Sequence, residues 1–303
     1  MKCRRCKGPA VIELRRHNAG FCGDCFVHHC REQVRRAIDE HRMMAAGERV
    51  LVAVSGGKDS LALWDILIEL GYSVDGLYLG LGIGEYSASS GDHTRAFAAR
   101  RGAHLIEIDL PTDLGFDIPN GSRAAKRVPC SACGLSKRHL FNQAAVDGGY
   151  DVVATGHNLD DEAAVLFGNV LRWNIEYLGR QLPVLAAGLG FVRKVKPLVR
   201  LGEREMAAYC ILRGIDYIVE ECPMAEGNRH LAYKEALNDI EERSPGAKAA
   251  FYFEFLEKAS HLFQATADAT RAELRPCSSC GSATPGDTCA FCKLRARAGA
   301  ASS

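Results

Sequence analysis

The amino-acid sequence predicts an α/β fold, with a doubly wound, mostly parallel sheet flanked by a small cysteine-rich module at each end. Apolar runs alternate with helical stretches from residue 49 to residue 213. The first run, residues 50–54, leads into a glycine-rich loop and then a helix. Paired Cys-x-x-Cys units stand near both termini. Continuous apolar strands that alternate with helices are typical of a parallel sheet covered on both faces.

The strands and helices of this sheet follow one another in chain order. Strands are expected at residues 50–54, 74–81, 104–108, 151–155 and 191–195, and helices at 61–70, 89–101, 133–147, 159–178 and 202–213. A further helix, from residue 31 to about residue 44, leads into the domain. In a doubly wound sheet the ligand binds at the carboxyl ends of the strands, so functional residues are expected in the loops that follow them.

Composition limits the protein classes. The chain has 303 residues, 47% hydrophobic and 25% charged, enough for one sizeable domain with small appendages. The net charge is +1, so any nucleic-acid binding must come from local basic patches. Neither a secretory signal nor an apolar run of about 18 residues is present, so we expect a cytoplasmic protein without membrane contact. In that reducing compartment, thirteen cysteines indicate metal sites or sulfur chemistry rather than disulfides.

Each end of the chain carries four cysteines at zinc-site spacing. Two tight Cys-x-x-Cys turns place four thiolates around one tetrahedral ion, whose binding supplies about 10 kcal/mol of folding energy to such small modules. The expected zinc ligands are Cys3, Cys6, Cys22 and Cys25 in the first module and Cys277, Cys280, Cys289 and Cys292 in the second. In the first module, His28, His29 or Cys30 could replace Cys25 as the fourth ligand.

These sites divide the chain into five parts. We expect an N-terminal zinc module at residues 1–30 and the main domain at 31–263. A linker, or the last turns of a helix, should follow at 264–275, then a zinc ribbon at 276–294 and a disordered tail at 295–303.

The loop at residues 55–60 has the properties of a phosphate cradle. Gly56 and Gly57 let backbone amides approach an anion, the loop opens a helix, and Lys58 adds a positive charge. The spacing differs from that of a Walker A loop. A tight turn without a ligand is the alternative. A second strand–turn–helix segment, residues 154–161, should face the first and ends in Asp160 and Asp161, which are either metal ligands or an acidic first turn of a helix.

The hexapeptide at residues 55–60, Ser-Gly-Gly-Lys-Asp-Ser, resembles the signature of PP-loop ATP pyrophosphatases, which split ATP into AMP and pyrophosphate. The resemblance implies that the loop holds the β and γ phosphates and that Asp160 or Asp161 lies near Mg²⁺. The nucleotide-binding residues that it implies are Ala53, Ser55, Gly56, Gly57, Lys58, Asp59, Ser60, Gly156, His157, Asp160 and Asp161.

Three further cysteines bear on which reaction a PP-loop enzyme of this kind performs, thiolation or amide formation. Cys130 and Cys133 lie at the start of an expected helix, and Cys222 lies in a strand end or loop. Three soft ligands leave one coordination position open on a bound metal. By their spacing alone the thiols could bind a cluster or zinc, or form a disulfide-cycling pair with Cys222 as persulfide carrier.

From the first Cys-x-x-Cys unit to the last, the chain closely resembles the TtuA-like tRNA 2-thiouridine synthetases and, more distantly, the TtcA-like tRNA thiolases. The resemblance implies that Cys130, Cys133 and Cys222 bind a 4Fe-4S cluster with one free iron, which carries the sulfur. Lys137 matches a family lysine near the active site, and Asp161 joins it as a catalytic residue. It also implies a homodimer and a ubiquitin-like carrier with a C-terminal thiocarboxylate as sulfur donor.

Basic residues surround the expected thiol site, which favours tRNA as the substrate. Solvated charged faces would look the same in the sequence. Three other functions compete: a thiolase for a small molecule, an amide-forming PP-loop synthetase, and a non-enzymatic RNA-binding module. The basic patches contain Arg123, Lys126, Arg127, Lys137 and Arg138; Arg193, Lys194, Lys196 and Arg200; and Lys2, Arg4, Arg5, Lys7, Arg15 and Arg16.

Overall fold

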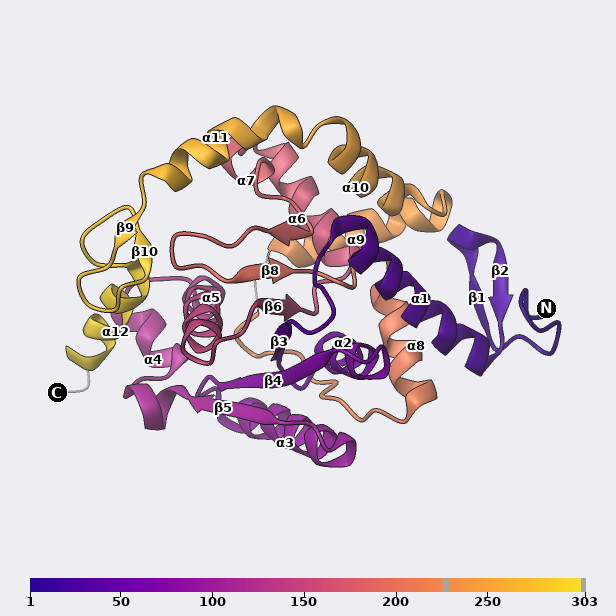
Figure 1. Ribbon diagram of the computed structural model, residues 1–303, viewed down its shortest axis with the longest axis horizontal. Helices are drawn as coiled ribbons and strands as arrows, with labels where there is room; N and C mark the ends of the chain where they lie inside the picture. The colour runs from indigo at the N-terminus through magenta and orange to yellow at the C-terminus, as the bar shows by residue number, and fades with distance from the viewer. Residues whose placement is uncertain (226–228, 301–303) are drawn as a thin grey trace.

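A six-stranded sheet forms the centre of the computed structural model, which describes residues 1–225 and 229–300 (Figure 1). The strand order is β5-β4-β3-β6-β8-β7. All neighbours are parallel except β7, which pairs antiparallel with β8 at one edge. The strands are β3 (Arg49–Val54), β4 (Ser73–Gly80), β5 (Leu105–Asp109), β6 (Val152–Thr155), β7 (Val184–Leu185) and β8 (Arg193–Val195). The expected mostly parallel α/β fold is confirmed.

Helices cover both faces of this sheet, so its strands are apolar on both sides. In β3, Val50, Val52 and Val54 belong to one hydrophobic cluster, and Leu51 belongs to a second. The first cluster contains residues of α1 (Gly23–His41), α2 (Lys58–Glu69) and α8 (Glu203–Arg213). The second contains residues of α4 (Ile118–Ala124), α5 (Pro129–Asp147) and α12 (Ala290–Ala300). The helix α3 (Gly84–Arg101) connects β4 to β5.

The N-terminal module is continuous with the main domain. It contains β1 (Ile12–Leu14), the short helix η1 (Arg15–His17) and β2 (Ala19–Phe21), and it leads directly into α1. Cys3, Phe21 and Phe26 are buried in the same cluster as the sheet residues. The boundary expected at residue 30 therefore falls inside one helix, which begins at Gly23 rather than near residue 31. A single helix shared by both parts ties the module rigidly to the domain.

The C-terminal half adds helices that the sequence pattern did not separate. The expected helix at 159–178 is two helices, α6 (Leu159–Leu171) and α7 (Ile175–Leu178), and α9 (Arg229–Arg243) and α10 (Ala247–Lys258) follow α8. Helix α11 (His261–Ala272) occupies most of the segment expected as a linker or as the last turns of a helix. In Figure 1, α11 arches from α10 to the hairpin of β9 (Arg275–Pro276) and β10 (Ala283–Thr284).

The expected disordered tail begins as a helix. Helix α12 continues to Ala300, and its residues Leu294 and Ala298 are 2% and 3% exposed. These apolar side chains pack in the second hydrophobic cluster, and this burial stabilises a segment whose composition alone predicted disorder. Residues 301–303 of the expected tail lie outside the described residues. Within the described part of the chain, no helix is long and apolar enough to cross a membrane.

Candidate active site

The loop between β3 and α2 is folded into a preformed anion cradle. Gly56 adopts φ +72°, and a Cβ built on it would lie 2.3 Å from the backbone oxygen of Ser90, so only glycine fits. The hydroxyl of Ser60 accepts from the Ser55 amide at 3.1 Å and donates to the Gly57 carbonyl at 3.0 Å. Ser55 is exposed, and the helix begins at Lys58. The loop therefore presents the amino end of α2 to an incoming anion.

The turn between β6 and α6 lies directly against this loop. A Cβ on Gly156 would meet backbone atoms of Asp59 and Ser60 at 3.0 Å, so the two turns pack backbone to backbone. Asn158 and Asp161 cap α6 by reciprocal hydrogen bonds, each of 3.1 Å. The Oγ1 of Thr155 lies 2.9 Å from Nδ1 of the exposed His157. Ala53 pairs with Thr155 in the strand register, so the two segments meet as the sequence predicted.

A chain of alternating charges runs across the mouth of the loop. Lys58 Nζ lies 2.7 Å from Glu203 Oε1 and 3.3 Å from Asp59 Oδ2. Lys234, from α9, lies 2.6 Å from Asp161 Oδ1 and 3.2 Å from Glu203 Oε2. Three carboxylates and two ammonium groups are thus gathered at one point. Such a site can exchange its internal ion pairs for contacts with a phosphate and a divalent cation.

Among these five charged groups, the carboxyl of Asp59 is one whose ionised form is disfavoured by burial. Burial raises the pKa of its carboxyl to about 6, while Lys58 acts in the opposite direction and the charge of Asp161 adds to the rise. The Asn158 side chain donates a hydrogen bond of 3.0 Å to it. A buried, ionised carboxylate is stabilised when a cation approaches, because the cation offsets the cost of desolvation. This favours a metal ion beside Asp59 and Asp161.

The neighbouring Asp160 has a different environment. Its carboxylate is 9% exposed, pairs with Lys248 of α10, and accepts a hydrogen bond of 2.7 Å from the Glu203 amide. These contacts fix the first turn of α8 to α6. Of the two carboxylates that the sequence offered for Mg²⁺, Asp161 therefore faces the loop, whereas Asp160 is engaged with the scaffold. The assignment of either to a metal stays a prediction.

The three isolated thiols gather at the start of α5. Cys130 and Cys133 lie on its first turn, and Cys222 lies in the irregular segment after α8. Cys130 Sγ donates to the Met224 carbonyl at 3.4 Å, so the Cys222 segment packs against this helix end. Burial raises the pKa of Cys130, the charges of Cys133 and Cys222 raise it further, and Lys137 lowers it. All four groups therefore lie within electrostatic reach of one another.

Two cavities lie beside the loop and at the sheet edge. A narrow cavity of about 30 Å³ has both Ser55 and Lys137 in its lining. Its wall residue Tyr86 has a raised pKa, first through burial and then through the charges of Cys222 and Cys133. Tyr86 therefore lies within electrostatic reach of two of the thiols as well as in the wall that Ser55 and Lys137 share.

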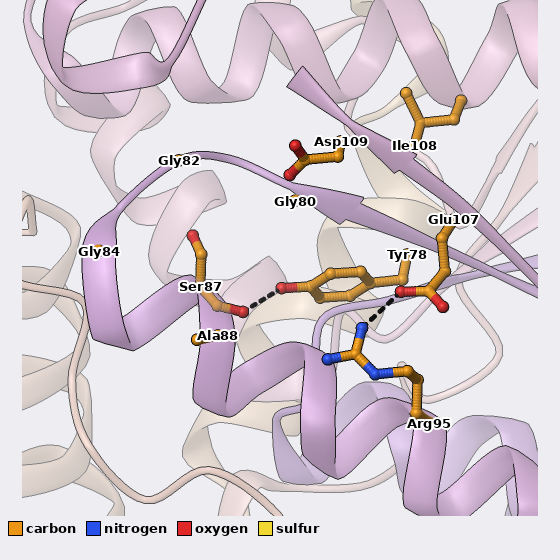
Figure 2. Close-up of a pocket in the computed structure, with 10 residues that line it drawn as sticks. All are labelled: Tyr78, Gly80, Gly82, Gly84, Ser87, Ala88, Arg95, Glu107, Ile108 and Asp109. Atoms are coloured by element: carbon orange, nitrogen blue, oxygen red, sulfur yellow. Dashed lines mark hydrogen bonds and ion pairs between the residues drawn. The ribbon is translucent and has the colours of Figure 1, made fainter. Parts of the chain in front are cut away.

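The larger cavity, of about 500 Å³, lies at the carboxyl ends of β4 and β5 (Figure 2). Tyr78 and Ser87 line both cavities, and the tyrosine hydroxyl donates to the Ser87 carbonyl at 2.6 Å. An ion pair of 2.7 Å between Arg95 and Glu107 closes one side. The size suits a small ligand, and the position is the one at which doubly wound sheets bind ligands.

Both terminal cysteine groups form closed four-thiol sites. The Sγ atoms of Cys3, Cys6, Cys22 and Cys25 all lie within 4.8 Å of one another, as do those of Cys277, Cys280, Cys289 and Cys292. Backbone amides near Cys6 and Cys22 lower the pKa of Cys3 to about 6, and the amide of Cys289 does the same for Cys277. Thiolates in this arrangement suit zinc. Cys25, rather than a neighbouring histidine, completes the first site.

The thiols at 130, 133 and 222 are not among the groups whose ligand atoms converge within 4.8 Å in the described residues. The donor set, three thiols without a nitrogen or oxygen ligand, is that of iron–sulfur sites.

The sequence did not reveal three charged residues of the site. Glu203, Lys234 and Lys248 come from α8, α9 and α10, far along the chain from the loop. None of them belongs to a recognisable motif. For Lys234 and Lys248, no periodicity distinguished them from other charges on a helix surface. For Glu203, its place in the first turn of a helix that follows a strand was the one usable signal.

The basic surface of α4 and α5 is accessible, as is the basic patch of the N-terminal module. Arg123, Lys126, Arg127 and Arg138 are exposed, and in the described part of the chain none of them has a carboxylate within 4.0 Å. The patch at 193–200 is different, because Arg193, Lys196 and Arg200 pair with Glu48, Glu162 and Glu40. The α4–α5 surface therefore presents several positive charges without a carboxylate partner, on the helix that carries Cys130 and Cys133 and on the helix before it.

Comparisons with known proteins agree with this geometry. Residues 2–27 match the family model of the N-terminal LIM domain of 2-thiouridine synthetase TtuA, and residues 28–233 match the PP-loop domain. The tRNA-5-methyluridine(54) 2-sulfurtransferase of Thermus thermophilus is 51% identical over 294 residues, which cover 97% of this chain and 91% of that protein. The protein of the same name from Pyrococcus horikoshii is 41% identical, with 97% and 93% covered.

Among solved structures, the U34-tRNA thiolase NcsA from Methanococcus maripaludis with its 4Fe-4S cluster has the same fold. The TM-score is 0.76 and the identity 24%, with 85% of this chain and 89% of that chain covered.

Proposed function

The chain belongs to the TtuA family of tRNA 2-thiouridine synthetases, and we propose that its substrate nucleotide is 5-methyluridine 54 of tRNA. The enzyme is a tRNA-uridine 2-sulfurtransferase of the PP-loop type, which exchanges the C2 oxygen for sulfur at the expense of ATP. Position 54 is the one named for its relatives at 51%, 41% and 37% identity. The relatives act on tRNA, which favours tRNA over a small-molecule acceptor.

The observation that carries the proposal is the closeness of the loop to the thiols. Ser55, Lys137 and Tyr86 line one narrow cavity, and Tyr86 lies within electrostatic reach of Cys133 and Cys222. A base bound over this wall would have an activating phosphate and a sulfur source near the same atom. An amide-forming synthetase has no use for thiols at this position.

In the first step the C2 oxygen bonds to the α-phosphorus of ATP, and the bond from this phosphorus to the pyrophosphate breaks. The backbone amides at residues 56–60 and the ammonium of Lys58 neutralise the charge of the departing pyrophosphate. Asp59 and Asp161 would hold a divalent cation, because both carboxylates lie at the mouth of the loop. Lys58 must exchange its Glu203 partner for phosphate in this step.

In the second step sulfur bonds to C2, and the C2–oxygen bond breaks as AMP leaves. Cys130, Cys133 and Cys222 would hold a 4Fe-4S cluster, whose iron without a protein ligand supplies a binding position for the sulfur. Lys137, in the wall between loop and thiols, would stabilise the negative charge of the α-phosphate. The exposed arginines of α4 and α5 would bind the tRNA backbone beside this opening.

The test is thionucleoside analysis after incubation of tRNA with anaerobically reconstituted protein, Mg-ATP and sulfide. Wild type should produce the 2-thio derivative at position 54. The Cys222→Ala variant should produce none, while it still exchanges pyrophosphate into ATP in the presence of tRNA. This split separates sulfur delivery from adenylation.

The matched control is the same tRNA with cytidine at position 54, which should gain no sulfur. A thionucleoside at another position would refute the choice of nucleotide. A protein with verified cluster and ATP turnover but no thionucleoside would refute tRNA thiolation.

Three further assignments complete the proposal. We place the protein in the cytoplasm, where thirteen cysteines stay reduced. The sulfur would come from a carrier protein with a ubiquitin-like fold and a C-terminal thiocarboxylate. We also expect a homodimer, because Trp173, Tyr177 and Leu262 are large apolar side chains that are 70%, 55% and 67% exposed. Sedimentation analysis and single-turnover assays with the thiocarboxylated carrier test these assignments.

A further inference from the structure

A second group of potential ligands lies between the N-terminal module and the main domain. One ligand atom each of His17, His29 and Glu205 lies within 4.8 Å of the other two, and Nε2 of His29 lies 4.0 Å from Oε1 of Glu205. His29 was one of the alternatives for the first zinc site, but four cysteines complete that site without it. The imidazole therefore belongs to a different cluster, which neither the catalytic path nor the four-cysteine sites use.

In the described part of the chain, Nε2 of His17, Nε2 of His29 and Oε1 of Glu205 are buried and lack a hydrogen-bond partner. Glu205 is 5% exposed. Its other oxygen, Oε2, accepts from Arg16 at 2.6 Å and from the Gly202 amide at 2.6 Å, which leaves Oε1 directed at the imidazoles. A buried polar atom without a partner costs about 1–3 kcal/mol, so three such atoms facing one another indicate a missing partner common to all.

The three side chains are held in place by separate elements. His17 ends η1, His29 lies on α1, and Glu205 lies on the first turn of α8. The ring of His29 stacks on Phe21 with centroids 4.9 Å apart, and the ring of His17 meets it edge-on at 5.4 Å. Glu205 is fixed by its capping contact with Gly202. Their arrangement does not depend on mobile surface side chains.

We propose that His17, His29 and Glu205 bind a Zn²⁺ ion that fastens the N-terminal module to helix α8. Two imidazole nitrogens and one carboxylate oxygen form a donor set that zinc uses, with a fourth tetrahedral position for water. Mg²⁺ and Ca²⁺ prefer oxygen ligands and are disfavoured here. A bridging water is the competing occupant, since buried waters also bind two to four polar partners.

The ion would connect the module to the nucleotide loop. Glu205 lies in the same helical turn as Glu203, whose carboxylate pairs with Lys58 at 2.7 Å. Ligation of Glu205 fixes the start of α8 and so the position from which Glu203 reaches the loop. The N-terminal module thereby contributes to the geometry of the loop without touching it.

The first experiment measures zinc and iron together in full-length protein, purified with zinc present and reconstituted anaerobically. We expect about three zinc ions per chain in wild type and about two in the His29→Gln and Glu205→Gln variants. The matched control is His28→Gln, which alters an exposed neighbour on the same helix and should retain about three. Wild type with two zinc ions and no change in the variants overturns the proposal.

The second experiment locates the ion and needs no variant, so a variant that fails to fold cannot obstruct it. Crystals of the wild-type protein grown with Zn²⁺ should give three anomalous peaks at the zinc absorption edge. One peak should lie between the two Nε2 atoms and Oε1 of Glu205. Peaks at the two four-cysteine sites alone, with a water between the histidines, would overturn the proposal.

Discussion

Replacing Asp59 by asparagine should stabilise the ligand-free protein at neutral pH. The folded pKa of about 6 lies above the ordinary value of 3.8, so the ionised carboxylate opposes folding. A shift of this size corresponds to about 3 kcal/mol, at about 1.4 kcal/mol per pKa unit. The side chain is 26% exposed, so the carboxylate is largely shielded from water. Losing an acidic group from the first turn of α2 removes about 0.5 kcal/mol, which leaves a net gain of about 2.5 kcal/mol.

The gain should depend on pH with a definite sign. Below pH 3.8 the carboxyl is protonated in both states, and its ionisation contributes nothing. As the pH rises from about 4 to about 6, the unfolded state loses its proton first and the folded state is progressively destabilised. Above this window the penalty is constant. At pH 5 the advantage of the Asp59→Asn variant should therefore be about half of that at pH 7.5.

Urea unfolding followed by circular dichroism at pH 7.5 and pH 5 measures both quantities. The control is Asp92→Asn, which alters an exposed carboxylate that pairs with Arg95 on the surface and should change stability by less than about 1 kcal/mol. An Asp59→Asn variant that is less stable than wild type at pH 7.5 would refute the reasoning. So would a gain that is equal at the two pH values.

Three other substitutions test separate parts of the structure. Gly56→Ala should abolish ATP binding in a calorimetric titration, because the φ of +72° and a clash with the α3 backbone exclude a Cβ at this position. The control, Gly47→Ala, has a φ of +86° in open space and should keep wild-type affinity for ATP. Phe291→Ala should destabilise the C-terminal ribbon by about 3–5 kcal/mol, because the buried phenyl ring is lost. Zinc should then transfer faster from the ribbon to a chromophoric chelator, and an unchanged rate would contradict a packing role for Phe291. The double variant Arg123→Ala, Arg127→Ala should weaken tRNA binding and reduce the steepness of the logarithm of the tRNA-binding constant against the logarithm of salt concentration by about 2. An unchanged slope would exclude the α4–α5 surface as a contact of the tRNA backbone.

The architecture of the sheet was predictable because its signals are local. The central strands β3 and β6 are short apolar runs, and each turn after them combines glycine with polar residues. Five of the six sheet strands lie within two residues of their expected positions, whereas the two-residue edge strand β7 was not expected. Residues 295–300 were misjudged because alanine and arginine without an apolar period suggested a solvated chain, whereas Leu294 and Ala298 pack on α4 and α5. That packing depends on residues about 170 positions away, which no local window contains.

The candidate site was predictable only where its residues belong to motifs. The loop at 55–60 and the Cys-x-x-Cys pairs have fixed spacing set by their ligands. Lys234 and Glu203 join the site through tertiary packing of α9 and α8 alone. Likewise, the sequence left the fourth zinc ligand open because Cys25 and His29 lie one helical turn apart on α1, and only the fold shows which faces the other cysteines.

The pairing of Lys58 with Glu203 has a consequence for turnover. A carboxylate that occupies the lysine between reactions competes with every anion that needs the same ammonium group. The competing carboxylate would lower the affinity of the loop for triphosphate and also its affinity for the pyrophosphate product. When pyrophosphate begins to leave, Glu203 can take back Lys58 before the anion rebinds. In the proposed mechanism, the resting ion pair would therefore reset the loop for the next nucleotide and keep the product from acting as a lasting inhibitor.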